Sequence, residues 1–208
     1  IVSESNMKPV RLGGINPDLP VVLNGGTCNP CLAIYDNQTN QYEYINVPFK
    51  LLDKNNSSEY ILNADDTLTL NFEAQWNGMT IAKTVTFYGN SYNTKHQYSI
   101  SNSMSNKFEV VWDGGMQAID QADYDWVTGN AMIGQSGETE SIQISDGERY
   151  IAREEYNGST DWVTVRTKYF IAALLADDTA DYASMLGNVD QKAISPSYTV
   201  GLGYYGTQ

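Results

Sequence analysis

The chain has 208 residues and a formal net charge of −13, and only 18% of its residues are charged, whereas Tyr (15) and Gly (17) are abundant. Low charge with many β-favouring residues is typical of a β-rich domain with turns, because helical surfaces usually carry many Lys, Glu and Arg residues. Strong acidity without any cluster of basic residues argues against nucleic-acid binding and against docking on anionic lipid.

The amino-terminal third carries few regular patterns. Residues 1–31 are rich in Gly, Pro and Asn and are predicted to form loops with one short strand, and residues 1–67 as a whole are expected to be loop-rich. No run of about 18 apolar residues occurs, so the sequence predicts no membrane-spanning helix. Because the chain starts at Ile1 without a signal peptide, we expect a piece excised from a longer protein, with any membrane anchor outside it.

A β-hairpin is the clearest predicted element. In Leu68–Trp76 apolar and polar residues alternate, which is the period-2 pattern of a half-buried strand. Asn77-Gly78 follows, and this pair favours a two-residue hairpin turn because both residues tolerate positive φ. Met79–Tyr88 then alternates again, so we expect the two segments to pair antiparallel.

Several further strands are predicted toward the carboxyl end, separated by turns that mostly contain Gly or Asn. Their ranges are Tyr92–Ser101, Lys107–Trp112, Glu140–Ile144, Arg149–Glu155, Thr160–Arg166, Tyr169–Ala176 and Tyr198–Tyr205. The segment Asp120–Trp126 is predicted to be a loop. One short helical turn is predicted at Thr179–Leu186, with Thr179 as its N-cap and Gly187 as its C-cap.

These patterns together predict an all-β fold. No internal repeat and no linker divides the chain, so we expect residues 1–208 to form a single domain. Two packed, mostly antiparallel sheets with little helix are the expected architecture.

The Cys28-Asn29-Pro30-Cys31 motif invites a redox or zinc interpretation. A redox motif would need a helix after the first cysteine, and a zinc site would need further Cys or His ligands. The motif lies instead in a Gly/Pro/Asn-rich loop, and the chain has two cysteines and one histidine in all. A local disulfide between Cys28 and Cys31, or two inert thiols, is the favoured interpretation.

No catalytic, cofactor-binding or metal-binding residues are predicted. His96 lies on a predicted strand without a nearby nucleophile, and adjacent carboxylates on a strand point to opposite faces, so such pairs cannot flank one scissile bond. The acidic residues of Asp120–Asp125 lack the spacing of an EF-hand. A concave sheet lined with Tyr and Trp could stack a sugar, although cross-strand packing of the tyrosines is the favoured interpretation.

Two segments carry motifs that strand periodicity does not explain. In the first, a Gly-containing turn leads to Asp161-Trp162-Val163 and then to Lys168-Tyr169-Phe170, which opens an apolar strand. The second runs from Met79 through Phe87 to Ser91-Tyr92-Asn93 and later to Ile100-Ser101-Asn102. Both resemble segments of the large periplasmic domain of YidC-type membrane protein insertases, and the resemblance covers about Leu68 to Tyr205. The family-motif residues, expected to be structural or to mediate interactions, are Lys83, Phe87, Tyr92, Trp162, Lys168, Tyr169 and Phe170.

The resemblance implies a β-supersandwich akin to galactose mutarotase, placed at the periplasmic face of the bacterial inner membrane. It implies a noncatalytic domain without cofactors that serves as an accessory platform, with Sec translocon accessory subunits and nascent membrane proteins as partners. The alternative is an extracytoplasmic carbohydrate-binding module or a mutarotase-like enzyme, although mutarotase chemistry with a single histidine is disfavoured. A secreted redox protein is the third hypothesis.

Overall fold

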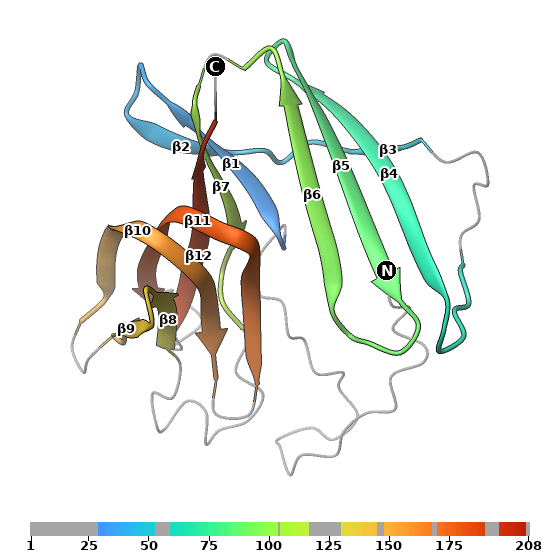
Figure 1. The fold of residues 1–208 in the computed structure, drawn as a ribbon. Coiled ribbons are helices and arrows are strands. Elements are labelled where there is room, and N and C mark those ends of the chain that lie inside the picture. The colour runs from blue at the N-terminus through green and yellow to red at the C-terminus, as the bar shows by residue number, and fades with distance from the viewer. Residues whose placement is uncertain are drawn as a thin grey trace. The chain divides into compact units, whose positions relative to one another are not determined.

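The computed structural model describes residues 29–52, 59–103, 105–116, 130–144, 148–167, 170–189 and 196–206. In these ranges every regular element is a strand, and the strands form two antiparallel sheets (Figure 1). The prediction of an all-β fold with two antiparallel sheets is therefore confirmed. The closer likeness to galactose mutarotase and the single domain stay predictions.

The chain divides into two compact units, one with residues up to Tyr44 and from Lys107 onward, and one with Ile45–Asn106. The first unit contains an eight-stranded sheet in the order β2-β1-β7-β12-β11-β10-β8-β9. Its strands are β1 (Cys31–Asp36), β2 (Gln41–Tyr44), β7 (Lys107–Trp112), β8 (Asn130–Gln135), β9 (Glu138–Ile142), β10 (Tyr150–Arg166), β11 (Ile171–Val189) and β12 (Pro196–Tyr205).

The second unit contains a four-stranded sheet in the order β3-β4-β5-β6. Its strands are β3 (Lys50–Leu51), β4 (Thr67–Trp76), β5 (Met79–Tyr88) and β6 (Thr94–Ser101). The predicted hairpin is confirmed: β4 and β5 pair from Thr67↔Tyr88 to Trp76↔Met79. Asn77 and Gly78 both have positive φ, as a tight turn between these strands requires.

Most strands predicted after residue 90 occur close to their expected ranges. β7 matches its predicted range, β6 and β12 differ from theirs only at one end, and β9 lies slightly nearer the amino end than expected. The predicted strands Arg149–Glu155 and Thr160–Arg166 are one continuous strand, β10. The expected turn between them is an irregularity in the ladder, where the register shifts between Asn157 and Thr160.

The predicted helical turn at Thr179–Leu186 is wrong, because this segment belongs to β11. Tyr182 pairs with Asn157 on one side and Gly203 on the other, so the backbone is hydrogen-bonded within a sheet on both sides. The residues from Tyr182 to Met185 are all buried. A central strand that is buried on both faces does not show the alternation of polar and apolar residues by which strands are usually recognised. Its hydrogen bonds to both neighbouring strands stabilise it more than the helix-capping residues Thr179 and Gly187 would stabilise a helix.

The strands β1, β2, β3 and β8 were not predicted. All four are short, and β8 (NAMIGQ) contains a glycine and lacks a clear alternation of apolar and polar residues. The predicted amino-terminal loop up to Cys28 and the predicted loop at Asp120–Trp126 lie outside the described residues. Within the described ranges no helix is long and apolar enough to cross a membrane.

The core of the first unit forms on one face of the eight-stranded sheet. β8, β10, β11 and β12 lie side by side there, and their inward residues interlock across the strands. The largest contributors include Ile133, Val163, Val165, Met185, Val200 and Leu202. Each is at most 2% exposed, so each contributes on the order of 1.5–3 kcal/mol of hydrophobic stabilisation.

Gly203 on β12 makes room for an aromatic ring on the opposite face of the same sheet. It pairs with Tyr182 across the ladder. A Cβ atom built at Gly203 would lie 2.0 Å from the Tyr182 ring, closer than any real contact allows. β12 pairs with β11 and β7 without a register shift, so the glycines of YTVGLGYY form no bulge there, and Gly203 leaves space for the Tyr182 ring.

We predict that Gly203→Ala lowers the free energy of unfolding by about 1–3 kcal/mol, because the added methyl group must displace a packed ring. Urea unfolding followed by circular dichroism measures the change. In a Tyr182→Ala background the same substitution should cost much less, since the ring is gone. An equal cost in both backgrounds would contradict the steric explanation.

Candidate functional site

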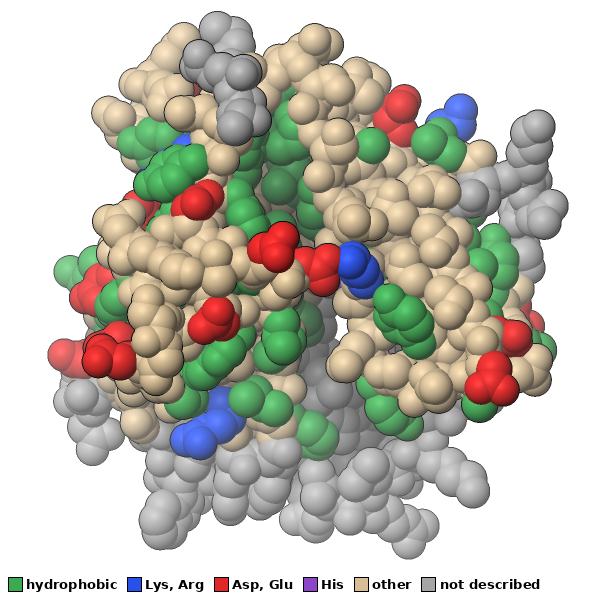
Figure 2. Space-filling model, in the orientation of Figure 1, with side chains coloured by type: hydrophobic (Ala, Val, Ile, Leu, Met, Phe, Trp, Pro, Cys, Tyr) green, Lys and Arg blue, Asp and Glu red, His purple; other side chains and the backbone are tan. Residues whose placement is uncertain are grey.

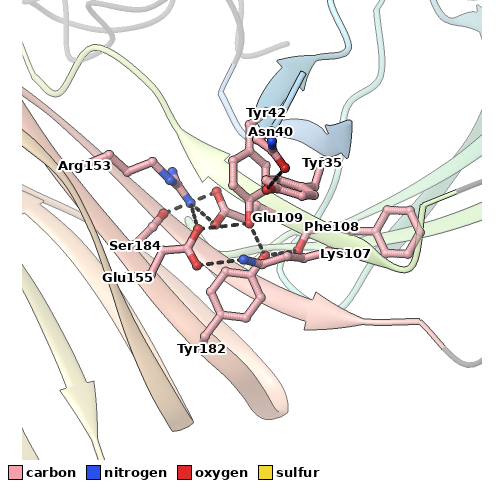
Figure 3. A network of polar contacts seen from close by, with 10 residues as sticks. All are labelled: Tyr35, Asn40, Tyr42, Lys107, Phe108, Glu109, Arg153, Glu155, Tyr182 and Ser184. Carbon is pink, nitrogen blue, oxygen red and sulfur yellow. Dashed lines mark hydrogen bonds and ion pairs between the residues drawn. The ribbon is translucent and has the colours of Figure 1, made fainter. Parts of the chain in front are cut away.

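A group of polar and aromatic side chains gathers on the face of the eight-stranded sheet opposite the core (Figure 3). Alternate residues of a strand share a face, so Lys107 and Glu109 on β7 lie on the same side. Tyr182 and Ser184 on β11 are aligned with them through the pairings of β12. We call the following set the tyrosine–ion network: Tyr35, Tyr42, Lys107, Glu109, Arg153, Glu155, Tyr182 and Ser184.

Glu109 is the buried centre of the network. Its side chain is 1% exposed, and the Nη2 atom of Arg153 donates a short hydrogen bond to its Oε1 atom. The Ser184 hydroxyl donates to its Oε2 atom at 3.3 Å. Burial raises the pKa of the Glu109 carboxyl, and the neighbouring Arg153 guanidinium offsets part of that shift. A buried carboxylate is tolerated here because both of its oxygens are hydrogen-bonded.

Glu155 forms the outer, more exposed layer. Its Oε2 atom lies 2.7 Å from the Lys107 Nζ atom, and its Oε1 atom lies 3.3 Å from the Arg153 Nη2 atom. Partial burial works to raise the pKa of Glu155, but the two cations outweigh it and hold the pKa below its ordinary value. Arg153 thus bridges the two carboxylates, one buried and one near the surface.

Three tyrosine rings surround the Lys107 ammonium group. The Nζ atom lies 4.7 Å from the ring centre of Tyr182, 5.1 Å from that of Tyr35 and 5.5 Å from that of Tyr42. Arg153 also stacks on Tyr42, with its guanidinium carbon 4.2 Å from the ring centre. Such contacts stabilise a cation that is partly withdrawn from water.

The phenol groups connect the network to the backbone. The Tyr182 hydroxyl donates to the carbonyl oxygen of Phe108 at 3.1 Å and lies 2.8 Å from the Tyr42 hydroxyl. The Tyr42 hydroxyl also donates to the Oε1 atom of Glu155 at 3.3 Å, so the two phenols link the backbone of β7 to the outer carboxylate. Burial raises the pKa of Tyr42 to about 12, and the pKa of Tyr182 also lies above its ordinary value.

The network links side chains from several strands of the eight-stranded sheet. Glu109 and Glu155 both accept hydrogen bonds from the Nη2 atom of Arg153. The members of the network come from β1, β2, β7, β10 and β11, and β12 runs beneath them. Among the described residues no group of three or more His, Cys, Asp or Glu side chains is arranged to hold a metal ion.

The motif residues of the first unit lie elsewhere on the sheet. Trp162 on β10 faces Gly134 on β8 so closely that a Cβ atom there would meet the indole at 2.2 Å. Phe170 packs against the core, and its carbonyl oxygen accepts a hydrogen bond from the Thr167 amide. Lys168 and Tyr169 lie outside the described residues.

The motif residues of the second unit do not form one cluster either. The Lys83 Nζ atom lies 5.3 Å from the ring centre of Tyr98 and 5.9 Å from that of Phe49, and burial lowers its pKa. Phe87 pairs with Thr94 on β6. Tyr92, in the turn before β6, is fully exposed at 102%. The interaction role of all these motif residues stays a prediction.

The cysteine motif is only half described. Cys31 is the first residue of β1, is 3% exposed and is disulfide-bonded. Among the described residues there is no free cysteine. Cys28 lies outside those residues, so the pairing of Cys28 with Cys31 stays a prediction.

His96 on β6 lies on the apolar side of its sheet. Its Nε2 atom lies 2.9 Å from the Thr94 hydroxyl, and its Nδ1 atom is buried with no hydrogen-bond partner among the described residues. Burial and the nearby Lys83 charge lower the pKa of His96 to about 4. The ring is therefore neutral at pH 7, in a setting that penalises its charged form.

We predict that Glu109→Ala lowers the free energy of unfolding by about 3 kcal/mol, because it leaves Arg153 half-buried without its main partner. Glu138→Ala serves as the control, since Glu138 is exposed on β9. That variant should stay within about 0.5 kcal/mol of the original chain. Denaturant titration compares the two, and equal effects would show that the Glu109–Arg153 pair does not stabilise the sheet.

We further predict a pH dependence that His96 controls. The unfolded ring binds a proton near pH 6.5 and the folded ring only near pH 4, so the unfolded state binds more protons between these values. Stability should therefore decrease as the pH falls from about 6.5 to about 4. His96→Gln should remove this part of the decrease, which thermal unfolding across that range measures. If the stability of both proteins depends on pH in the same way, His96 is not the group responsible.

Comparison with known proteins identifies the family. Residues 37–205 match the YidC periplasmic domain family, a range that starts before the predicted resemblance and contains all of the tyrosine–ion network except Tyr35. Membrane protein insertase YidC of Chloroherpeton thalassium is 28% identical over 161 residues, which cover 72% of this chain and 27% of that protein. The same protein of Chlorobium luteolum is 34% identical over 105 residues, covering 48% and 18%.

A third relative, membrane protein insertase YidC of Chlorobium limicola, is 35% identical over 95 residues, covering 43% of this chain and 16% of that protein. The chain thus spans at most about a quarter of the length of these relatives. No solved structure matches it significantly. Since the family match runs from the start of the β1–β2 turn to the last residue of β12, the chain belongs to the family of YidC periplasmic domains.

Proposed function

We propose that this chain is a noncatalytic periplasmic part of an inner-membrane protein insertase and serves as an accessory interaction platform during insertion and folding of membrane proteins. The family match over residues 37–205 is the observation that carries the proposal. The partners we propose are Sec translocon accessory subunits and nascent membrane proteins. The chain would lie at the periplasmic face of the inner membrane, anchored by helices outside it.

The structure supports a platform rather than an enzyme. In the tyrosine–ion network the carboxylates are paired with cations, and the rings are engaged by Lys107 and Arg153. These contacts link β7, β10 and β11, and a sheet held by such contacts suits a surface that must present a fixed shape. Figure 2 shows acidic side chains scattered over the visible face with few basic ones, in keeping with the net charge of −13.

The carbohydrate-binding alternative would use aromatic rings beside carboxylates on one sheet face. The network has both, but a sugar stacking on Tyr42 would have to displace the Arg153 guanidinium, whose carbon lies 4.2 Å from the ring centre. It would also have to compete with Lys107 for Glu155. The contacts of Arg153 and Lys107 within the network therefore occupy the positions that a sugar would need.

We predict that replacing residues 37–205 by a short flexible linker, in the longer insertase that contains this chain, leaves insertion of a substrate membrane protein into reconstituted vesicles measurable. Copurification of Sec accessory subunits should decrease several-fold. The isolated 208-residue chain should show no mutarotase and no thiol–disulfide exchange activity. Complete loss of insertion, or turnover in either enzyme assay, would contradict an accessory, noncatalytic role.

A further inference from the structure

The first part of β11 is an edge of the eight-stranded sheet. β11 pairs with β10 from Ile171 onward, whereas its pairing with β12 begins only at Tyr182. Ile171–Ala176 therefore has β10 on one side, and no strand of the described ranges pairs with its other side. We call Ile171–Ala176, with the sequence IAALLA, the apolar edge segment.

The two faces of the apolar edge segment differ in burial. Ala172, Leu174 and Ala176 pack against the core. Ile171 and Leu175 point to the other face and are 60% and 74% exposed, and Ala173 between them is exposed as well. The segment thus offers both an open backbone edge and a row of apolar side chains.

Such an edge is unusual for a folded protein. Exposed strand edges are normally protected by charged residues, Pro or bulges, because their free N–H and C=O groups recruit other chains. The edge strand β9 follows this rule with Glu138 and Glu140. The apolar edge segment has no charged residue and no Pro, and its register with β10 is regular from Trp162↔Leu175 to Arg166↔Ile171.

The charges at its two ends differ in sign. Arg166 pairs with Ile171 at the start of the segment and is exposed. Asp177 and Asp178 follow its end and are exposed too. A strand added here would meet apolar side chains along its middle and carboxylates at one end. The complementary partner is an extended apolar segment with basic residues at the end that lies beside Asp178.

We propose that the apolar edge segment is a docking site at which an extended apolar segment of another polypeptide adds as a strand beside β11, with its basic end next to Asp178. Backbone hydrogen bonds supply affinity, and the contacts with Ile171 and Leu175 supply selectivity. A second copy of this chain fits less well, because each copy carries a net charge of −13. The docking site would add a binding surface to the proposed platform, and it rests on the proposed function only for the identity of the natural partner.

Two synthetic peptides test the site on the 208-residue chain. Both carry the same alternating apolar and Thr residues in an extended sequence, and one ends in two Lys where the other ends in two Glu. Fluorescence anisotropy should show at least tenfold tighter binding of the Lys-ended peptide. Hydrogen exchange at the amides of Ile171–Ala176 should slow when it binds, because strand addition protects them.

Leu175→Gln should weaken binding of the Lys-ended peptide about tenfold, since one large apolar contact is lost without a change of charge. Tyr150→Gln is the matched control, because Tyr150 is 72% exposed at the far end of β10, and it should bind as the original chain does. Asp178→Lys should remove most of the preference between the two peptides, because it neutralises the charge of the Asp177-Asp178 pair. Circular dichroism checks that each variant is folded.

Equal binding by Leu175→Gln and the original chain, or no change in exchange at Ile171–Ala176, would overturn the docking site. So would concentration-dependent dimerisation that Leu175→Gln abolishes, since a second copy would then be the occupant. These outcomes are distinct from those for the proposed function. If Sec subunits still copurify with the Leu175→Gln variant, the accessory platform is supported but uses a different surface. If the peptide binds and no Sec subunit copurifies, the edge site is supported and the proposed partners are wrong.

Discussion

The buried ion pair between Glu109 and Arg153 is the constraint on which the eight-stranded sheet depends. A buried carboxylate is stable in this position because Arg153 and Ser184 satisfy its oxygens. Apolar contacts tolerate small shifts between strands better than a buried carboxylate whose two oxygens each accept a hydrogen bond. The pair therefore links β7 to β10 and β11 across the intervening β12.

The same pair explains features of the sequence that otherwise look like defects. Gly201 and Gly203 place two glycines in the interior of a strand, where they are normally unfavourable. A Cβ atom at Gly201 would lie 3.0 Å from the Glu109 carboxylate, and one at Gly203 would overlap the Tyr182 ring. The glycines on β12 thus provide the space that the large polar side chains on β7 and β11 occupy.

A feature could be predicted from the sequence when the residues that form it lie close together along the chain. The β4–β5 hairpin was predictable because its turn, Asn77-Gly78, lies between the two strands that it joins. The carboxyl half of β11 was mistaken for a helix because the cap-like residues Thr179 and Gly187 are local signals, while the strand pairings that override them are not. The tyrosine–ion network was out of reach for the same reason: Tyr42 contacts Tyr182 across 140 positions of sequence.

The place of β7 in the sheet has a consequence for how the chain folds. β7 lies between β1, near the amino end, and β12, which closes the carboxyl end. A chain that emerges from the ribosome amino end first cannot complete this sheet until its last strand is available. Pairing of strands so distant in sequence is intrinsically slow. The Ile45–Asn106 unit, whose β4, β5 and β6 pair in sequence order, can form early, so the two units are expected to mature at different times during synthesis.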